Sequence, residues 1–116
     1  MMEQFTPAVY LIANVSTEKP TELLEKLTEK FTEAYGPADS FYAVDQNVIA
    51  FVNQHPESGE VLFEIQALTV EDSANGVKAA TEIAKEVAGI ELSWVDVTRA
   101  AVEYHSSKPK EEEGQE

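Results

Sequence analysis

The sequence predicts a small α+β domain with the element order strand, helix, strand, strand, helix, strand. The first observation behind this prediction concerns residues 40–70, which are rich in Val, Ile, Phe and Tyr and are interrupted by turn-forming residues, as expected for neighbouring strands. On either side of them, apolar residues recur at three- and four-residue steps, which is typical of amphipathic helices. The length of 116 residues fits one domain that buries a core without disulfides or metal.

The first strand and first helix are expected before the central segment. Residues 8–15 have apolar side chains on both faces, which indicates an interior strand. Ser16 or Thr17 can cap the following helix, and Pro20 suits its first turn because the missing N–H would be unpaired there. Gly36, followed by a proline, ends it. Its apolar stripe is Leu23, Leu24, Leu27, Phe31, Ala34 and Tyr35.

The central segment is expected to supply two neighbouring strands. Residues 41–44 and 48–53 have strand composition, and the three residues between them contain no glycine. Because such a tight turn is uncommon, we interpret both stretches as one bulged strand, with two short strands as the alternative. After a Pro/Gly loop at residues 54–59, residues 60–68 alternate. The expected inward side chains are Val61, Phe63, Ile65 and Ala67.

A second helix is expected over residues 70–88, and a last strand over residues 90–97. Thr69 and Asp72 have capping-box spacing, and Gly89 follows the last turn. The Asn75–Gly76 pair weakens the first turn, so we expect the regular helix to begin late. The small-residue stripe of this helix is Val77, Ala80, Ile83, Ala84, Val87 and Ala88.

The end of the chain leaves one alternative open. Residues 98–105 are compatible with a strand extension or a short helix, and residues 106–116 form a charged tail that we expect to be disordered. Residues 1–105 would then form a single α+β domain.

This order of elements folds most readily into a ferredoxin-like β-α-β-β-α-β sandwich. Two helices would cover one face of a four-stranded antiparallel sheet, with residues 98–105 as an extra C-terminal element. The same order also serves the small dimeric α/β barrels, in which two such sheets pack face to face. The similarity is one of architecture, and no sequence motif ties the chain to a family.

In this architecture one face of the sheet carries no helix and presents an apolar surface crossed by two polar side chains. Such surfaces usually mark an interface. A second copy of the chain is the favoured covering, which predicts a homodimer; residues 98–105, or another protein or ligand, are the alternatives. The expected interface residues are Tyr10, Ile12, Leu62, Glu64, Gln66, Leu68, Leu92 and Trp94, with either Ile49 and Phe51 or their neighbours.

Charge narrows the range of partners. The chain has 22 acidic and 8 basic residues, a net charge of −14, and most of that charge lies outside the tail. Such a surface repels nucleic acid and anionic lipid and attracts basic proteins. There is no cysteine, which is compatible with a reducing compartment. The N-terminal apolar run is too short and polar for a signal peptide or membrane span, so we expect a cytoplasmic protein.

No motif for catalysis, metal or cofactor binding is recognisable, so we expect no cofactor and no metal. The best polar group is Asp45, Asp96 and Arg99, the only arginine, which would form a structural ion pair or clamp a carboxylate bidentately. His55 and His105 are expected to be exposed.

The leading hypothesis is therefore a small acidic, non-enzymatic binding or regulatory domain that self-associates through the helix-free sheet face. The first alternative is a small enzyme or ligand carrier of the dimeric α/β-barrel type. The second is an acidic inhibitor or nucleic-acid mimic that binds a basic protein.

Overall fold

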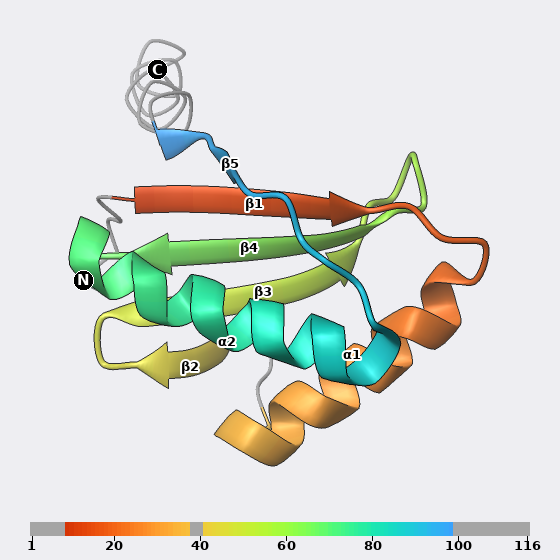
Figure 1. The fold of residues 1–116 in the computed structure, drawn as a ribbon, viewed down its shortest axis with the longest axis horizontal. Helices are drawn as coiled ribbons and strands as arrows, with labels where there is room; N and C mark the ends of the chain where they lie inside the picture. Colours follow the sequence, from red (N-terminus) through yellow and green to blue (C-terminus); the bar gives the residue numbers. More distant parts are fainter. Residues whose placement is uncertain (1–8, 38–40, 99–116) are drawn as a thin grey trace, which may run out of the picture.

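The computed structural model describes residues 9–37 and 41–98, and in these ranges it contains two helices and a five-stranded antiparallel sheet (Figure 1). The strand order is β2-β3-β4-β1-β5. In chain order the elements are β1 (Val9–Val15), α1 (Pro20–Tyr35), β2 (Tyr42–Asp45), β3 (Val48–Gln54), β4 (Val61–Ala67), α2 (Val70–Ala88) and β5 (Val95–Asp96).

The expected α+β class with two helices is confirmed, but the expectation of four strands is wrong. Residues 41–44 and 48–53 form two separate strands, β2 and β3, joined by a tight turn at Gln46 and Asn47. Neither turn residue has a positive φ, so the primed turns that normally close a two-residue hairpin are excluded. The pairing register shifts between Ala43 and Asp45 instead. This irregularity allows a turn without glycine to close.

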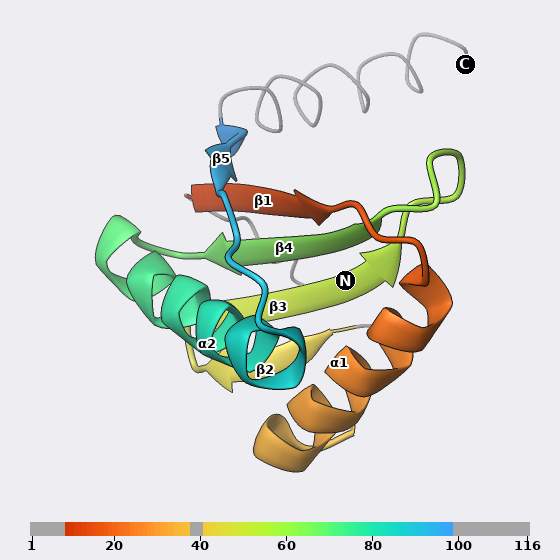
Figure 2. The ribbon, with the colours of Figure 1, turned by 45° about the vertical axis from the view of Figure 1, so that its right-hand side comes forward.

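Both helices cover the same face of the sheet, and the core lies between them and the strands (Figures 1 and 2). On α1 the stripe predicted from the sequence supplies Leu23, Leu27 and Phe31 to the core. The strands contribute their inward side chains, all nearly inaccessible to solvent. The largest fully buried ones are Phe31, Phe63, Leu27, Ile65, Val48 and Val61.

The first helix begins and ends where the sequence predicts. Pro20 occupies its first turn, and Gly36 follows it with a φ of +86°, a conformation that favours glycine. The side-chain cap expected from Ser16 or Thr17 is not formed. Lys19 holds the N-cap position without a side-chain hydrogen bond.

The second helix is regular from Val70, so the expectation of a late start is wrong. Thr69 caps it by accepting a hydrogen bond of 3.0 Å from the backbone N–H of Asp72. Gly76 is buried against the sheet: a Cβ built there would lie 2.6 Å from Cγ2 of Ile65 and 2.8 Å from Cγ1 of Val48. Glycine has a low helix propensity, but at this position it lets the backbone of α2 approach two strands.

The last strand is much shorter than the expected residues 90–97. Only Val95 and Asp96 pair with β1, opposite Ile12 and Leu11 respectively. The segment between α2 and β5 has no regular structure, and its large apolar side chains pack against the core. Apart from Thr98, the predictions for residues 98–105 and for the charged tail lie outside the described residues.

Candidate binding face

The face of the sheet opposite the two helices is the candidate functional site, and we call it the helix-free face. It is defined by the pairing register, because directly opposed residues point to the same side. Glu64 of β4 lies between Ile12 of β1 and Phe51 of β3, and Val95 of β5 lies opposite Ile12. The face consists of Tyr10, Ile12, Asn14, Ala43, Ile49, Phe51, Asn53, Leu62, Glu64, Gln66 and Val95.

Alternation along β4 confirms the side-chain directions predicted there. Val61, Phe63, Ile65 and Ala67 are buried under the helices, whereas the three residues between them are half-buried on the helix-free face. Register also settles the choice left open for β3, because Ile49 and Phe51 share the side of Glu64 and Gln66. The face therefore combines aliphatic, aromatic and amide side chains.

A hydrogen-bonded pair lies in the middle of the helix-free face. The Tyr10 hydroxyl donates to Oε1 of Glu64 across 3.0 Å. Burial raises the pKa of the Tyr10 phenol to about 12, and the Glu64 charge and this hydrogen bond add to the shift. Gln66, which lies opposite Tyr10, acts in the other direction. The pair gives the carboxylate a hydrogen-bond donor within a face whose other side chains are apolar or amide.

Charge is scarce on this face compared with the rest of the chain. Glu64 is the one charged side chain among its eleven residues, although 26% of the sequence is charged. The helices carry mixed charge. On α1, Lys30 contacts Glu33 at 3.4 Å and Glu86 of α2 at 2.9 Å. A partner recognised through charge would therefore meet the helices, and one recognised through apolar contact would meet this face.

Two exposed apolar side chains lie at the edges of the face. Phe41, 44% exposed, packs its ring 6.1 Å from that of Phe51, and Val95 on β5 is 56% exposed. Neither residue is among those expected at the interface. Strand alternation over residues 90–97, with Leu92 and Trp94 on the helix-free face, predicts the opposite side for Val95, and the pairing of Val95 with Ile12 shows that this is wrong.

Two of the expected interface residues lie elsewhere, and a third, Leu68, lies just beyond the paired residues that define the face. Leu68 follows β4 directly and is 41% exposed. Leu92 and Trp94 pack against the core beneath the helices, so their expected place on the helix-free face is wrong. The Trp94 ring lies edge-on to Phe63, 6.4 Å between centroids, and its indole N–H donates to Oγ1 of Thr81 on α2 at 3.4 Å. An indole N–H usually finds such a partner when it is buried.

The polar group predicted from Asp45, Asp96 and Arg99 is not assembled in the described residues. Asp45 and Asp96 lie on β2 and β5, the two opposite edges of the sheet. Asp45 accepts a hydrogen bond from Asn75 of α2 at 3.2 Å. Hydrogen bonds from the Thr98 hydroxyl and backbone N–H lower the pKa of Asp96. Arg99 lies outside the described residues, so its expected pairing is untested.

The remaining candidate residues have structural explanations or lie outside the description. Nδ1 of His55 accepts hydrogen bonds from the backbone N–H groups of Glu57 and Ser58, at 3.2 and 3.3 Å, and thereby closes the β3–β4 loop. His105 lies outside the described residues. Within residues 9–37 and 41–98, no group of His, Asp and Glu side chains is arranged to hold a metal ion.

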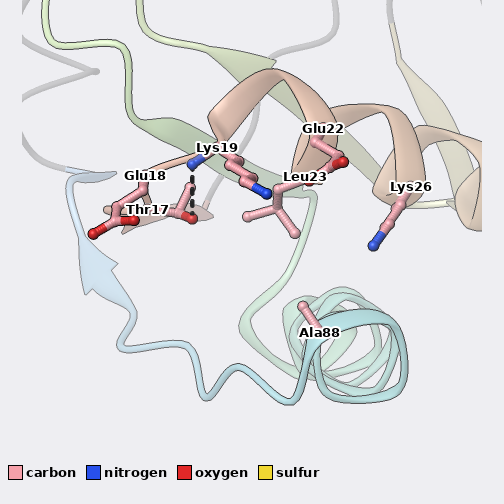
Figure 3. Close-up of a pocket in the computed structure, with 7 residues that line it drawn as sticks. All are labelled: Thr17, Glu18, Lys19, Glu22, Leu23, Lys26 and Ala88. Carbon is pink, nitrogen blue, oxygen red and sulfur yellow. Dashed lines mark hydrogen bonds between the residues drawn. The ribbon is translucent and has the colours of Figure 1, made fainter.

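Two surface hollows lie along α1, away from the helix-free face. One, of about 380 Å³, lies between the start of α1 and the end of α2 (Figure 3), and a second, of about 450 Å³, lies further along α1. The first is lined by Thr17, Glu18, Lys19, Glu22, Leu23, Lys26 and Ala88. Its lysines alternate with glutamates, and Oγ1 of Thr17 is occupied by the Lys19 N–H at 3.3 Å. We assign no ligand to either hollow.

No protein-family model matches the chain, and comparison with curated proteins and with solved structures gives no significant match. In the part of the chain that the structure describes, none of the helices is both long enough and apolar enough to cross a membrane.

Proposed function

We propose that the protein is a non-enzymatic, cytoplasmic binding or regulatory module that self-associates through the helix-free face. The observation that carries the proposal is the composition of this face: apolar and amide side chains on five strands, with a single carboxylate that is already hydrogen-bonded. Contiguous apolar patches of this kind are unusual on soluble monomers and mark interaction sites.

The size of the face suits a stable homodimer. Its three long strands have seven residues each and extend about 23 Å, whereas β2 and β5 have four and two residues. At the usual strand spacing this gives a flat footprint of roughly 400 Å², and the relief of the side chains adds accessible area. A standard stable interface buries about 800 Å² of accessible surface per partner, which is the same order.

Charge favours a second copy over a basic protein as the partner. A basic protein would be drawn to the carboxylates of the helices, while the helix-free face offers it one carboxylate. A second copy presents the same nearly uncharged surface, so apolar burial is not opposed by desolvation of many ions. The acidic exterior then stays in solvent, where it limits further association.

We also propose that the fold is a ferredoxin-like sandwich with one added edge strand. The order β3-β4-β1-β5, with α1 and α2 on one face, supports this assignment, and β2 is then the addition. Face-to-face pairing of such sheets is the arrangement expected for dimeric α/β barrels.

The test is the molar mass in solution at two protein concentrations, by light scattering at pH 7.5. We expect the mass to rise from that of one 12.8-kDa chain toward twice that value. Ile49→Glu, which adds a charge to an apolar part of the face, should weaken association at least about tenfold, a change of 1.4 kcal/mol. Ile49→Thr, which keeps β-branching, should act in the same direction with less effect on folding.

Val70→Glu is the matched control, since it adds the same charge at an apolar residue that is 75% exposed at the start of α2. It should leave the mass unchanged. A monodisperse monomer at all concentrations would refute the proposed self-association, and would favour a covering of the face by residues beyond Thr98.

A further inference from the structure

Glu64 has a special position within the helix-free face. It is the fourth of the seven residues of β4, and β4 is the third of the five strands. Its carboxylate therefore lies near the geometric centre of the face. The described side chains opposite it are Ile12 and Phe51, one on each neighbouring strand.

The surroundings of Glu64 contain no basic group to compensate its charge. The Tyr10 phenol donates a hydrogen bond to it without supplying a positive charge. The nearest described carboxylate on the same side is Glu60 at the edge of the face, whose Oε1 accepts a hydrogen bond from Nδ2 of Asn14 at 3.1 Å, and it adds negative charge. The side chains that β3, β2 and β5 present on the same side as Glu64 are amide or apolar. The Asp45 carboxylate accepts a hydrogen bond from Asn75 of α2, on the covered side of the sheet. Asp96 accepts one from the Thr98 N–H and lies opposite Leu11, which points to the other side from Ile12. Neither carboxylate therefore faces Glu64.

In a symmetric dimer, Glu64 of one subunit would lie close to Glu64 of the other. A two-fold dimer uses the same patch on both subunits, and a residue near the centre of that patch lies near the two-fold axis. The two Glu64 carboxylates would then approach each other in a surface shielded from water. Two like charges in such a place disfavour the doubly ionised state, and a shared or added proton relieves the repulsion.

We propose that Glu64 makes the self-association of this protein pH-dependent, with proton uptake at the paired Glu64 carboxylates favouring the dimer. This inference rests on the proposed function. By linkage, a dimer that binds more protons than two monomers becomes more stable as the pH falls. Tyr10 remains a hydrogen-bond donor in both protonation states, so the switch changes charge and leaves the local contact in place.

The experiment measures the dimer dissociation constant by sedimentation equilibrium at pH 7.5 and pH 5.5, each in 0.15 M and 0.5 M NaCl. The proteins are the wild type, Glu64→Gln and Glu29→Gln. The glutamine at position 64 keeps an oxygen that can accept from Tyr10 and removes the charge. Glu29 is exposed on the outer side of α1, and its replacement makes the same change in net charge away from the face.

At pH 7.5 we expect Glu64→Gln to dimerise at least about tenfold more tightly than the wild type, because the glutamine removes the repulsion between the two carboxylates. Glu29→Gln should stay within about twofold of the wild type because an exposed charge is largely screened. At pH 5.5 the wild type should approach Glu64→Gln. Because the comparison is made at equal pH and salt, the general loss of negative charge on acidification cancels.

The outcomes separate this inference from the proposed function. Absence of association for the wild type and for Glu64→Gln at both pH values would overturn both. Association with equal dissociation constants for these two proteins, or weaker association of Glu64→Gln, would overturn the role of Glu64 and leave the dimer standing. A wild type that dimerises at pH 7.5 at least about tenfold more weakly than Glu64→Gln, and that approaches the variant at pH 5.5, supports both.

Discussion

The two faces of the sheet differ in how deeply their side chains are buried. On the face under the helices, β4 presents Phe63 and Ile65, which are 1% exposed or less, and α2 closes over them with alanines and Gly76. On the other face, β4 presents Leu62, Glu64 and Gln66, all half-buried, with no described element above them. Because successive side chains of a strand point to opposite faces, one strand can have buried core residues on one face and half-buried residues on the other.

The described fold depends on the residues of the covered face more than on those of the helix-free face. Small residues on α2 let the helix approach the sheet, so the covered face derives its stability from close packing. The helix-free face carries large side chains, such as Ile49 and Phe51, that close no core within the described residues. These side chains contribute less to the described core than those of the covered face.

The largest expected effect comes from truncating one phenylalanine on each face. Phe63→Ala should lower the free energy of unfolding by about 3–5 kcal/mol, because it leaves a cavity in a fully buried core. Phe51→Ala should cost less than about 1.5 kcal/mol in the monomer, since its ring already contacts solvent. Urea unfolding at a concentration that keeps the protein monomeric measures both. Equal losses would mean that the helix-free face is covered in the monomer.

A smaller effect is expected at Gly76, where the covered face has no spare room. Alanine normally stabilises a helix interior relative to glycine. Here the new methyl would overlap Ile65 and Val48, so Gly76→Ala should lower the free energy of unfolding by about 1–3 kcal/mol. The double variant with Val48→Ala should cost less than the sum of the two single changes in a thermal or urea cycle. Strict additivity would contradict the contact.

The smallest effect on stability, and the most specific, concerns Tyr10 on the helix-free face. Its pKa of about 12 lies above the ordinary 10.0, so the folded state holds the phenolic proton more tightly than the unfolded state. This contribution to stability is complete below pH 10 and is lost as the pH rises toward 12. In an ultraviolet titration, one tyrosine phase should appear near pH 12 and vanish in Tyr10→Phe.

Glu64→Gln should move that phase to lower pH, because it removes the carboxylate charge that opposes ionisation. Burial, the largest cause of the shift, remains, so the return toward 10.0 should be partial. Tyr42→Phe is the control, since Tyr42 lies under α1 with its hydroxyl 3.3 Å from that of Thr32. If the late phase survived in Tyr10→Phe, the assignment would be wrong.

Local patterns predicted the covered half of the molecule well. The cap expected from Ser16 or Thr17 is not formed, and the late start expected for α2 is wrong. Pro20 and Gly36 nevertheless give the bounds of α1, and Thr69 gives the start of α2, because these signals depend on residues that are neighbours in sequence. The alternation of β4 gave its buried face for the same reason. The role of Gly76 could not be predicted, since it depends on side chains of two strands that are distant in the chain.

Predictions failed where tertiary pairing decides. The turn at Gln46 and Asn47 lacks glycine, and its closure depends on a register shift in β2 that composition does not reveal. Trp94 was expected on the helix-free face because alternation was extended through residues 90–97. Only the pairing of Val95 with Ile12 fixes that register, and the chain before it is not a strand. The helix-free face was thus predicted at β1 and β4 and missed at its β5 edge.

The place of β1 between β4 and β5 has a consequence for the order of folding. Val9 pairs with Ala67 and Leu11 with Asp96, so the first strand of the described chain gains its partners only from distant and later segments. The β2-β3-β4 meander, by contrast, joins neighbours in sequence and can form early. Because closing long loops is slow relative to local pairing, insertion of β1 should limit the folding rate. Until β1 has inserted, the backbone N–H and C=O groups along this edge of β4 are unpaired and can bind another extended chain.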